Sequence, residues 1–398
     1  MTKDSPFPQD TRRRWTRRLA AVAVVGSVIA VLTATALFVV ELILRDQFAQ
    51  NLYSEARRRP PHPFLQVLGG YSVPVNASGF RGDPITEEKP AGAFRIIALG
   101  GSTTLGVANE YEETYPFYLQ QMLRAQYPGV TIEVQNAGVA WYSTAHLLVN
   151  YELRVRPFKP DLVIVFEAIN DLYRSFSPPW WATGPFKPDY SHFLGPYARL
   201  LGPDVDAVAA APRPLGYEWL LWRNLKRRFG GEPTPYDNRA ENVARVTARL
   251  QARPVQTFRA LPVFRRNYER LVSNMLADGH AVVVASQPFL FRPDLSPADK
   301  SLIYYPQIFC AEDGFYPTLD SMAAGMRQFN AEARTVAEAA HVPFLDFESA
   351  VPKTGEYFSD DVHLRAPANR ILAKTVFDWI VAQKLINPPL GGKPLAPR

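Results

Sequence analysis

Residues 94–103 read FRIIALGGST, and this stretch decides the fold that we expect. An apolar run at residues 94–99 leads directly into Gly100 and Gly101, and then into Ser102. A short, continuous apolar run that ends in turn residues is typical of a β-strand buried on both faces. Glycines at its end permit a sharp turn and let another molecule approach the backbone closely. The stretch therefore predicts a buried strand followed by a turn that exposes a serine.

Strand-like and helix-like segments alternate along the rest of the chain. Four further apolar runs predict strands at residues 130–134, 162–166, 281–286 and 342–345. Apolar residues at helical spacing predict helices at residues 115–126, 264–277, 322–340 and 368–383. This alternation indicates an α/β fold, with one five-stranded parallel sheet covered by helices on both faces. In such a sheet the carboxyl ends of the strands lie along one edge, where active sites collect.

The N-terminal region has the features of a membrane anchor. Residues 1–18 form a basic stub, with six Lys and Arg against two Asp. Residues 19–40 contain no charged side chain, and a helix of these 22 residues, at about 1.5 Å per residue, crosses a hydrocarbon core of about 30 Å. We expect a transmembrane helix at residues 19–44, with the stub in the cytoplasm and the rest of the chain exported to the periplasm or outside the cell. A cleaved signal peptide is the alternative, but the apolar run continues past the small residues Ala34-Thr35-Ala36.

The remaining chain divides into a connector, one large domain and a tail. We expect residues 45–90 to form the connector and residues 91–387 the α/β domain, interrupted by a Pro/Trp-rich insertion at about residues 174–256. A long insertion between two strands is often a lid or a binding surface. Residues 388–398 are rich in Pro and Gly and are expected to be disordered.

Composition argues against several kinds of partner. The formal net charge is +6, but much of the surplus lies in the N-terminal stub, and no Lys/Arg stripe with interleaved aromatic residues follows it. We therefore expect no nucleic-acid partner. The single cysteine, Cys310, cannot form an intramolecular disulfide. The six histidines form no pair with metal-ligand spacing, so we expect neither a metal nor a cofactor.

A residue that can donate a hydrogen bond follows each of the first three predicted strands. Ser102 lies at a strand-to-helix turn, where its own N–H is near a helix N-terminus and suits an oxyanion. Gly138 follows the second strand and offers a backbone N–H, with a plain turn glycine as the alternative. Asn170 follows the third strand and offers a side-chain N–H, with a helix N-cap as the alternative.

A fourth element, Asp360-Asp361-Val362-His363, precedes the last predicted helix. In a turn, the Asp360 carboxylate can accept a hydrogen bond from Nδ1–H of His363, which fixes the tautomer and leaves Nε2 free as a base. The spacing alone is weak evidence. The evidence becomes stronger when all four elements are considered together, because they occur in a fixed order and each is expected at the sheet edge where active sites form.

In that order, these elements resemble the four blocks of the SGNH (GDSL-like) hydrolase superfamily, which supply Ser, Gly, Asn and His. The resemblance covers roughly residues 76–385. It implies a flavodoxin-like three-layer sandwich and a Ser-His-Asp mechanism, with Ser102 as nucleophile, His363 as base and Asp360 as the third member. It also implies an oxyanion hole formed by the N–H groups of Ser102 and Gly138 and the side-chain amide of Asn170.

The chain departs from the superfamily pattern at two positions. Gly101 stands where Asp is usual, and Ala168 stands where Gly is usual. We expect the methyl group of Ala168 to narrow the pocket near the oxyanion hole.

The sequence thus predicts a membrane-anchored serine esterase or acyl-transfer enzyme that acts on ester-linked groups, with O-acetyl favoured. An exported domain with a tryptophan-rich insertion suggests an acylated carbohydrate of the cell envelope as substrate. Two alternatives stay open: an O-acetyltransferase that uses the same triad, and a non-catalytic envelope module that retained the fold.

The basic stub makes a prediction about topology. A reporter fused after Arg398 should be active only outside the cytoplasm, because the Lys/Arg cluster keeps the N-terminus inside. Paired fusions to a phosphatase, which is active after export, and to a fluorescent protein, which is active inside, measure the orientation. The same fusions without residues 1–44 serve as the cytoplasmic control. A fluorescent full-length fusion with a silent phosphatase would overturn the expected localisation.

Overall fold

The computed structural model of the chain describes residues 9–58, 61–62, 66–67, 73–176, 250–310 and 314–386. It contains two compact units, one of residues 1–55 and 206–232 and one of residues 56–205 and 233–398. Most of the predicted insertion, residues 177–249, and the predicted tail lie outside the described residues.

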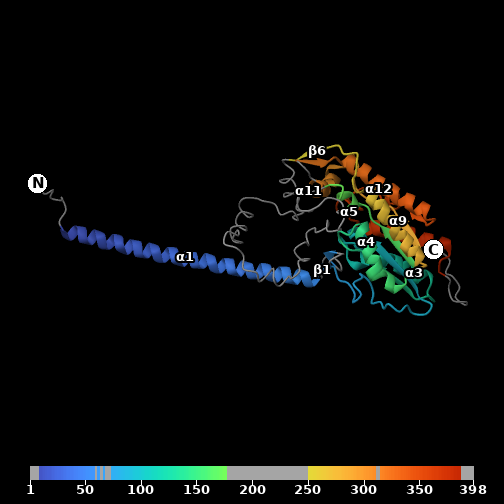
Figure 1. Cartoon of the computed structure of the whole chain (residues 1–398), viewed down its shortest axis with the longest axis horizontal. Helices are drawn as coiled ribbons and strands as arrows, with labels where there is room; N and C mark the ends of the chain where they lie inside the picture. The colour runs from blue at the N-terminus through green and yellow to red at the C-terminus, as the bar shows by residue number, and fades with distance from the viewer. Residues whose placement is uncertain are drawn as a thin grey trace. The chain divides into compact units, whose positions relative to one another are not determined.

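Helix α1 (Gln9–Arg58) is one continuous helix (Figure 1). Its segment Arg13–Leu44 contains an 18-residue window with a mean hydropathy of 2.5, and the segment is long and apolar enough for a signal anchor or a transmembrane span. The helix does not end with the apolar run but continues to Arg58, into the predicted connector. No Pro or Gly occurs between Leu44 and Arg58, so nothing in that sequence stops the helix before Pro60.

The second unit is built on a five-stranded parallel sheet with the strand order β4-β3-β5-β7-β9. This confirms the α/β class and the parallel sheet, and the order places β3 between β4 and β5. The register aligns Gly100 with Phe166 and Ala98 with Asn136, so β3 and β5 end at the same level and β4 ends two residues earlier. The strands are β3 (Phe94–Gly100), β4 (Ile132–Asn136), β5 (Leu162–Phe166), β7 (Ala281–Ala285) and β9 (Phe344–Leu345).

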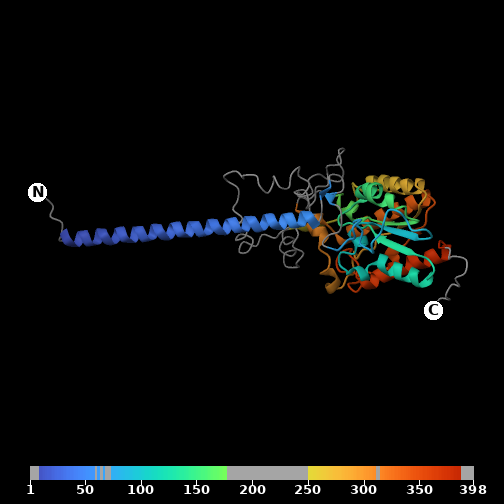
Figure 2. The same ribbon diagram turned by 90° about the horizontal axis from the view of Figure 1, so that it is seen from below.

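Helices cover both faces of the sheet (Figure 2). On one face α3 (Tyr115–Gln126) packs against α14 (Ala366–Gln383), and on the other α9 (Leu261–Ala277) packs against α4 (Thr144–Asn150) and α12 (Leu319–Ala339). Three of these helices begin two or three residues before the predicted start. Pro residues in the first turn of α9 and α14, and the Thr318 cap of α12, account for the earlier starts.

Shorter elements, which apolar spacing did not predict, connect these layers. They include the pairs β1 (Pro61–His62) with β2 (Gln66–Val67) and β6 (Gln251–Arg253) with β8 (Phe315–Pro317). The short helices are α2 (Ser102–Leu105), α5 (Ile169–Tyr173), α10 (Pro297–Lys300), α11 (Tyr305–Phe309), α13 (Phe347–Ala350), the single turns Tyr111–Glu113 and Arg156–Phe158, and the π-turn Tyr151–Val155.

A buried arginine fixes the short helix α2, which begins with Ser102. Arg81 is 2% exposed. Its guanidinium donates, at 2.7–2.8 Å, to three backbone carbonyls at the C-terminal end of α2 and just beyond it: those of Leu105, Gly106 and Asn109. Asn136, at the end of β4, adds a bond of 2.7 Å from Nδ2 to the Thr104 carbonyl. The last carbonyls of a helix have no partner within it, so these side chains complete α2 and fix its direction.

This arrangement predicts that Arg81→Met lowers the free energy of unfolding by more than about 2 kcal/mol, because it leaves buried carbonyls unsatisfied. Denaturant unfolding of the protein in detergent measures the change. Arg265→Met is the matched control, since Arg265 forms an exposed ion pair with Glu269 at 3.0 Å, which should contribute less than about 1 kcal/mol. Equal losses in the two variants would contradict the role given to Arg81.

Candidate active site

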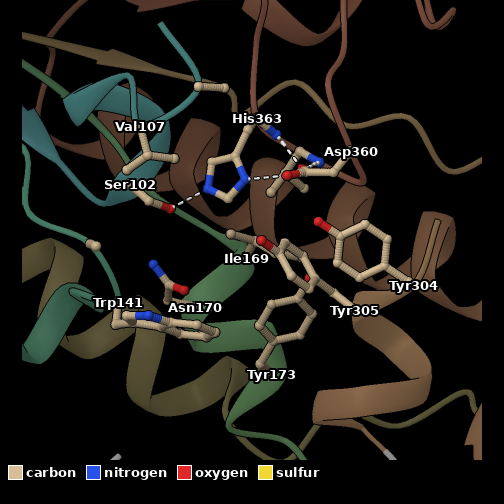
Figure 3. A pocket seen from close by; sticks show the side chains of 13 residues that line it. Ser102, Val107, Trp141, Ile169, Asn170, Tyr173, Tyr304, Tyr305, Asp360 and His363 are labelled. Carbon is tan, nitrogen blue, oxygen red and sulfur yellow. Dashed lines mark hydrogen bonds and ion pairs between the residues drawn. The ribbon is translucent and has the colours of Figure 1, made fainter. Parts of the chain in front are cut away.

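Three predicted site residues form one hydrogen-bonded chain. Ser102 Oγ lies 2.7 Å from His363 Nε2, and His363 Nδ1 lies 2.6 Å from Asp360 Oδ2 (Figure 3). A carboxylate only accepts hydrogen bonds, so the imidazole carries its proton on Nδ1 and presents a bare Nε2 to the serine hydroxyl. The chain joins residues that are 261 positions apart in the sequence.

The three-residue spacing of Asp360 and His363 closes a tight turn. Asp360 Oδ1 accepts from the backbone N–H of Val362 at 3.0 Å and from that of His363 at 2.9 Å. Burial alone would raise the pKa of Asp360, but the charge and hydrogen bonds of His363 and the bond from Val362 outweigh it and lower that pKa. Asp360 is therefore ionised and able to orient the imidazole.

These side chains open onto a cavity of about 300 Å³ whose wall is largely aromatic and aliphatic. Asn170 and Trp141 lie below Ser102 in Figure 3, and the ring of Tyr305 lies across from them. Among the residues that the structure describes, His363 and Asp360 are the only acidic or basic side chains on the wall. Its other members are Val107, Ala108, Ala140, Ile169, Tyr173, Tyr304 and Val362.

Asn170 lies on the cavity wall, and the structure rules out the alternative that it caps a helix. The cap of α5 is Ala168, and Asn170 is the second residue of the helix. Its Nδ2 donates one hydrogen bond to the Tyr142 carbonyl at 2.9 Å. An amide has two N–H donors, and the residues that the structure describes accept from one of them, so the other can serve a ligand in the cavity.

The prediction that Gly138 lines the site together with the other residues is wrong, because Gly138 lies outside the cavity wall. The Gly138 N–H donates to the side chain of Asn136 at 2.9 Å, and Gly138 is not part of the wall. A Cβ at this position would overlap the backbone nitrogen of Leu105. Gly138 is thus required for close packing of the loop on α2, which agrees with the alternative that it is a turn glycine.

This loop contributes Ala140 and Trp141 to the wall, and sequence analysis missed Trp141. Its backbone is in the left-handed region, with φ of 68°. That conformation is rare for a bulky residue and clusters at functional sites. Trp141 therefore occupies the place beside Asn170 where Gly138 was expected (Figure 3).

Ala168 does not narrow the cavity, contrary to expectation. It is 1% exposed and is not part of the cavity wall. Its N–H donates to Gln287 Oε1 at 2.7 Å, so the residue lies behind the site. The neighbouring Ile169 provides the wall instead.

The aromatic wall is tied to the loop that carries His363. Asp361 Oδ2 accepts from the backbone N–H groups of Tyr304 and Tyr305 at 3.1 and 3.2 Å. The ring of Tyr305 packs edge-to-face on His363, with 5.9 Å between centroids. Burial, and then the charge of Asp360, raise the pKa of Asp361 well above its usual value.

With this geometry established, the chain can be compared with known proteins. The model of the GDSL-like lipase/acylhydrolase family matches residues 98–371, which include Ser102, Asn170, Asp360 and His363. No curated protein matches the chain. Among solved structures, the chain is similar to an acetylxylan esterase from Geobacillus stearothermophilus, at 15% identity, with 73% of this chain and 96% of the other covered and a TM-score of 0.39. It is also similar to a lipase/acylhydrolase from Enterococcus faecalis, at 15% identity, with 75% and 100% covered and a TM-score of 0.40.

The position of Asn170 predicts the outcome of two substitutions. Asn170→Ala removes a donor to negative charge in the cavity, and kcat should fall on the order of 10²–10³-fold, or about 3–4 kcal/mol. Asn170→Asp should be worse, because an acceptor with negative charge replaces the donor. KM should change little, since the ground-state carbonyl gains less from the donor than the transition state does.

Steady-state kinetics on an aryl ester, with melting temperatures measured alongside, separate this role from a structural one. A matched control is Asn274→Ala, which removes an amide on α9 that bonds Glu152 at 2.8 Å, away from the cavity. Unchanged kcat in both Asn170 variants would eliminate the donor role.

Proposed function

The chain belongs to the GDSL-like lipase/acylhydrolase family and is an ester-bond hydrolase, and on this premise we propose that it acts through an acyl-enzyme formed on Ser102. The observation that supports this most directly is the hydrogen-bonded chain from Ser102 through His363 to Asp360 at the wall of the cavity. A nucleophile, a base and a group that orients the base are in mutual contact, as covalent catalysis requires.

In the first half-reaction, Ser102 Oγ attacks the ester carbonyl carbon while His363 Nε2 takes the hydroxyl proton. A C–O bond to the serine forms, and the carbonyl oxygen becomes negatively charged. Asp360 stabilises the imidazolium that results. When the tetrahedral intermediate collapses, the ester C–O bond breaks, and His363 gives its proton to the leaving alcohol. Water then repeats the sequence on the acyl-enzyme and releases the acid.

We assign the oxyanion to three donors. Ser102 is the first residue of α2, so its N–H has no acceptor within that helix. The side chain of Asn170 supplies the second donor. For the third we assign the backbone N–H of Trp141 in place of Gly138, because Trp141 lies on the wall and Gly138 does not. Fixed donors of this kind stabilise the charge that develops in the transition state.

The cavity wall supports an uncharged substrate. Besides the catalytic His363 and Asp360, the described wall offers no acidic or basic group to pair with a charged one. Four aromatic side chains provide flat apolar surface for an acyl group or the face of a sugar ring. We propose O-acetyl esters of a cell-envelope glycan as the substrate class, with α1 holding the domain at an exported membrane face.

We propose five segments along the chain. They are a basic stub at residues 1–18, a membrane helix at 19–44, a connector at 45–90, the hydrolase domain with its insertion at 91–387, and a tail at 388–398.

Labelling with a fluorophosphonate tests the acyl-enzyme. The wild-type protein in detergent should be labelled at Ser102, and Ser102→Ala should lose both labelling and turnover, by about 10³-fold or more. Ser301→Ala, an exposed serine on another loop, should behave as wild type. Labelling that persists in Ser102→Ala would remove Ser102 as the nucleophile.

A substrate panel tests the finer proposal. Short-chain aryl esters and acetylated glycans should be cleaved faster than long-chain or charged esters. An acceptor sugar added to the same reaction distinguishes hydrolysis from transfer, because the same residues serve both and only the product differs. Acetate as the sole product supports a hydrolase, and an acetylated acceptor supports an O-acetyltransferase.

A further inference from the structure

Glu167 is a buried carboxyl group that the proposed mechanism does not use. It immediately follows β5 and is 3% exposed. Its Oε1 accepts a hydrogen bond of 3.0 Å from the backbone N–H of Asn170. Glu167 is not part of the cavity wall, so it lies behind Asn170 and does not touch a substrate.

The second oxygen of Glu167 lies against the turn that precedes Ser102. A Cβ on Gly101 would overlap Glu167 Oε2 and would lie 2.8 Å from Nδ2 of Asn170. The carboxyl group, the Asn170 amide and the backbone at Gly101 therefore meet behind the nucleophile. This contact accounts for the glycine at position 101, where a side chain would displace both groups.

Glu167 belongs to a buried charged cluster with Asp171 and Arg174. Asp171 accepts from the backbone N–H and the hydroxyl of Thr144, at 2.9 and 2.7 Å. Arg174 donates to the backbone carbonyl of Asn170 at 2.5 Å and to that of Trp141 at 3.4 Å. The cluster thus contacts all three segments to which we assign an oxyanion donor.

We propose that Glu167 is a positioning residue of the oxyanion hole, whose neutral carboxyl group holds Asn170 and the turn before Ser102 in place. This inference rests on the proposed function. The charge of Arg174 acts on both buried carboxyl groups, so the cluster is balanced when one of them is neutral. Asp171 accepts two hydrogen bonds from Thr144, which favour its charged form, and this leaves Glu167 as the neutral partner. Burial, followed by the charge of Asp171, raises the pKa of Glu167 to about 8, in agreement with that assignment.

Ionisation of Glu167 should impair the reaction. A negative charge directly behind Asn170 opposes the charge that develops on the substrate oxygen, in a site where little water screens it. The folded protein also holds the proton of Glu167 more tightly than the unfolded chain does. The stability contributed by the neutral group is therefore present at acidic pH and is lost as pH rises through about 8.

A pH titration of Glu167 must be distinguished from that of the other ionisable groups that surround it. On α5, burial lowers the pKa of Arg174 to about 10. From α9, Tyr268 faces the carboxyl group, and burial raises its pKa well above 10. From the segment after β7, the neutral Gln287 bonds the N–H groups of Ala168 and Ile169. Asp171 is the other acid of the cluster, and burial raises its pKa too, so it must be tested alongside.

The experiment measures kcat/KM for an aryl ester from pH 6 to 10, with the full chain in detergent and spontaneous hydrolysis subtracted. The wild type should lose activity along one alkaline limb that begins near pH 8.

Glu167→Gln should keep wild-type activity at pH 7 within about threefold and lack that limb, since its amide is neutral at every pH. Glu167→Ala should lower kcat on the order of 10²-fold, because the donors are no longer held in place. Glu269→Gln, an exposed acid on α9, is the control.

Several outcomes would overturn the inference. One is an alkaline limb that persists in Glu167→Gln but vanishes in Asp171→Asn, which would move the titration to Asp171. Another is a kcat for Glu167→Ala that equals that of the wild type. Thermal unfolding at pH 6 and pH 9 detects variants that fail to fold, and there the stability of Glu167→Gln should depend less on pH than that of the wild type. A wild-type protein that is inactive and not labelled at Ser102 would reject the proposed function itself. If the wild type is labelled and active, a negative result with the Glu167 variants rejects only the positioning role of Glu167.

Discussion

The turn from β3 into α2 has no room for side chains, and the rest of the site depends on this constraint. A Cβ on Gly100 would overlap the side chain of Thr104 and lie 2.7 Å from the carbonyl of Phe166 at the end of β5. Because β3 lies between β4 and β5, its end meets the loops that follow both neighbours. The loop after β4 rests on α2 through Gly138, and the loop after β5 rests on the turn through Glu167. The absence of side chains at Gly100, Gly101 and Gly138 thus lets the neighbouring loops approach closely and fix the position of Ser102.

Helix α2 has four residues and is too short to be stable by itself. Arg81 and Asn136 satisfy the carbonyls at its C-terminal end, which lets the N–H end remain directed at the site. Burying a guanidinium and an amide costs free energy unless their hydrogen bonds are made, and here the bonds are made to the very carbonyls that need partners. The same principle recurs behind Asn170, where Asp171 and Arg174 are buried and bonded to backbone groups. Pre-organisation of the site therefore rests on buried polar groups and not on apolar packing alone.

The sequence predicted the parts of the site that are local. Strand β5 was predicted to the residue because it is buried on both faces and apolar throughout. Strand β4 was expected at residues 130–134 but spans Ile132–Asn136, because it contains polar residues that an apolar run does not reveal. Ser102 and the Asp360–His363 pair were readable because each depends on a few consecutive residues. Gly138 was misassigned because the folding of its loop decides which N–H faces the cavity, and the side chain of Asn136 occupies that of Gly138. Trp141 gave no signal, since a tryptophan in the left-handed region is rare.

One loop both orients the imidazole of His363 and holds the aromatic wall of the cavity. Asp360 orients His363, while the adjacent Asp361 binds the backbone of Tyr304 and Tyr305 on the opposite wall. A second carboxylate beside Asp360 would compete with it for the imidazolium, but burial raises the pKa of Asp361 and favours its neutral form. Since the ring of Tyr305 also rests on the imidazole, a group that displaced this ring would disturb the base as well. The aromatic wall and the imidazole are thus held by the same short segment, Asp360 to His363.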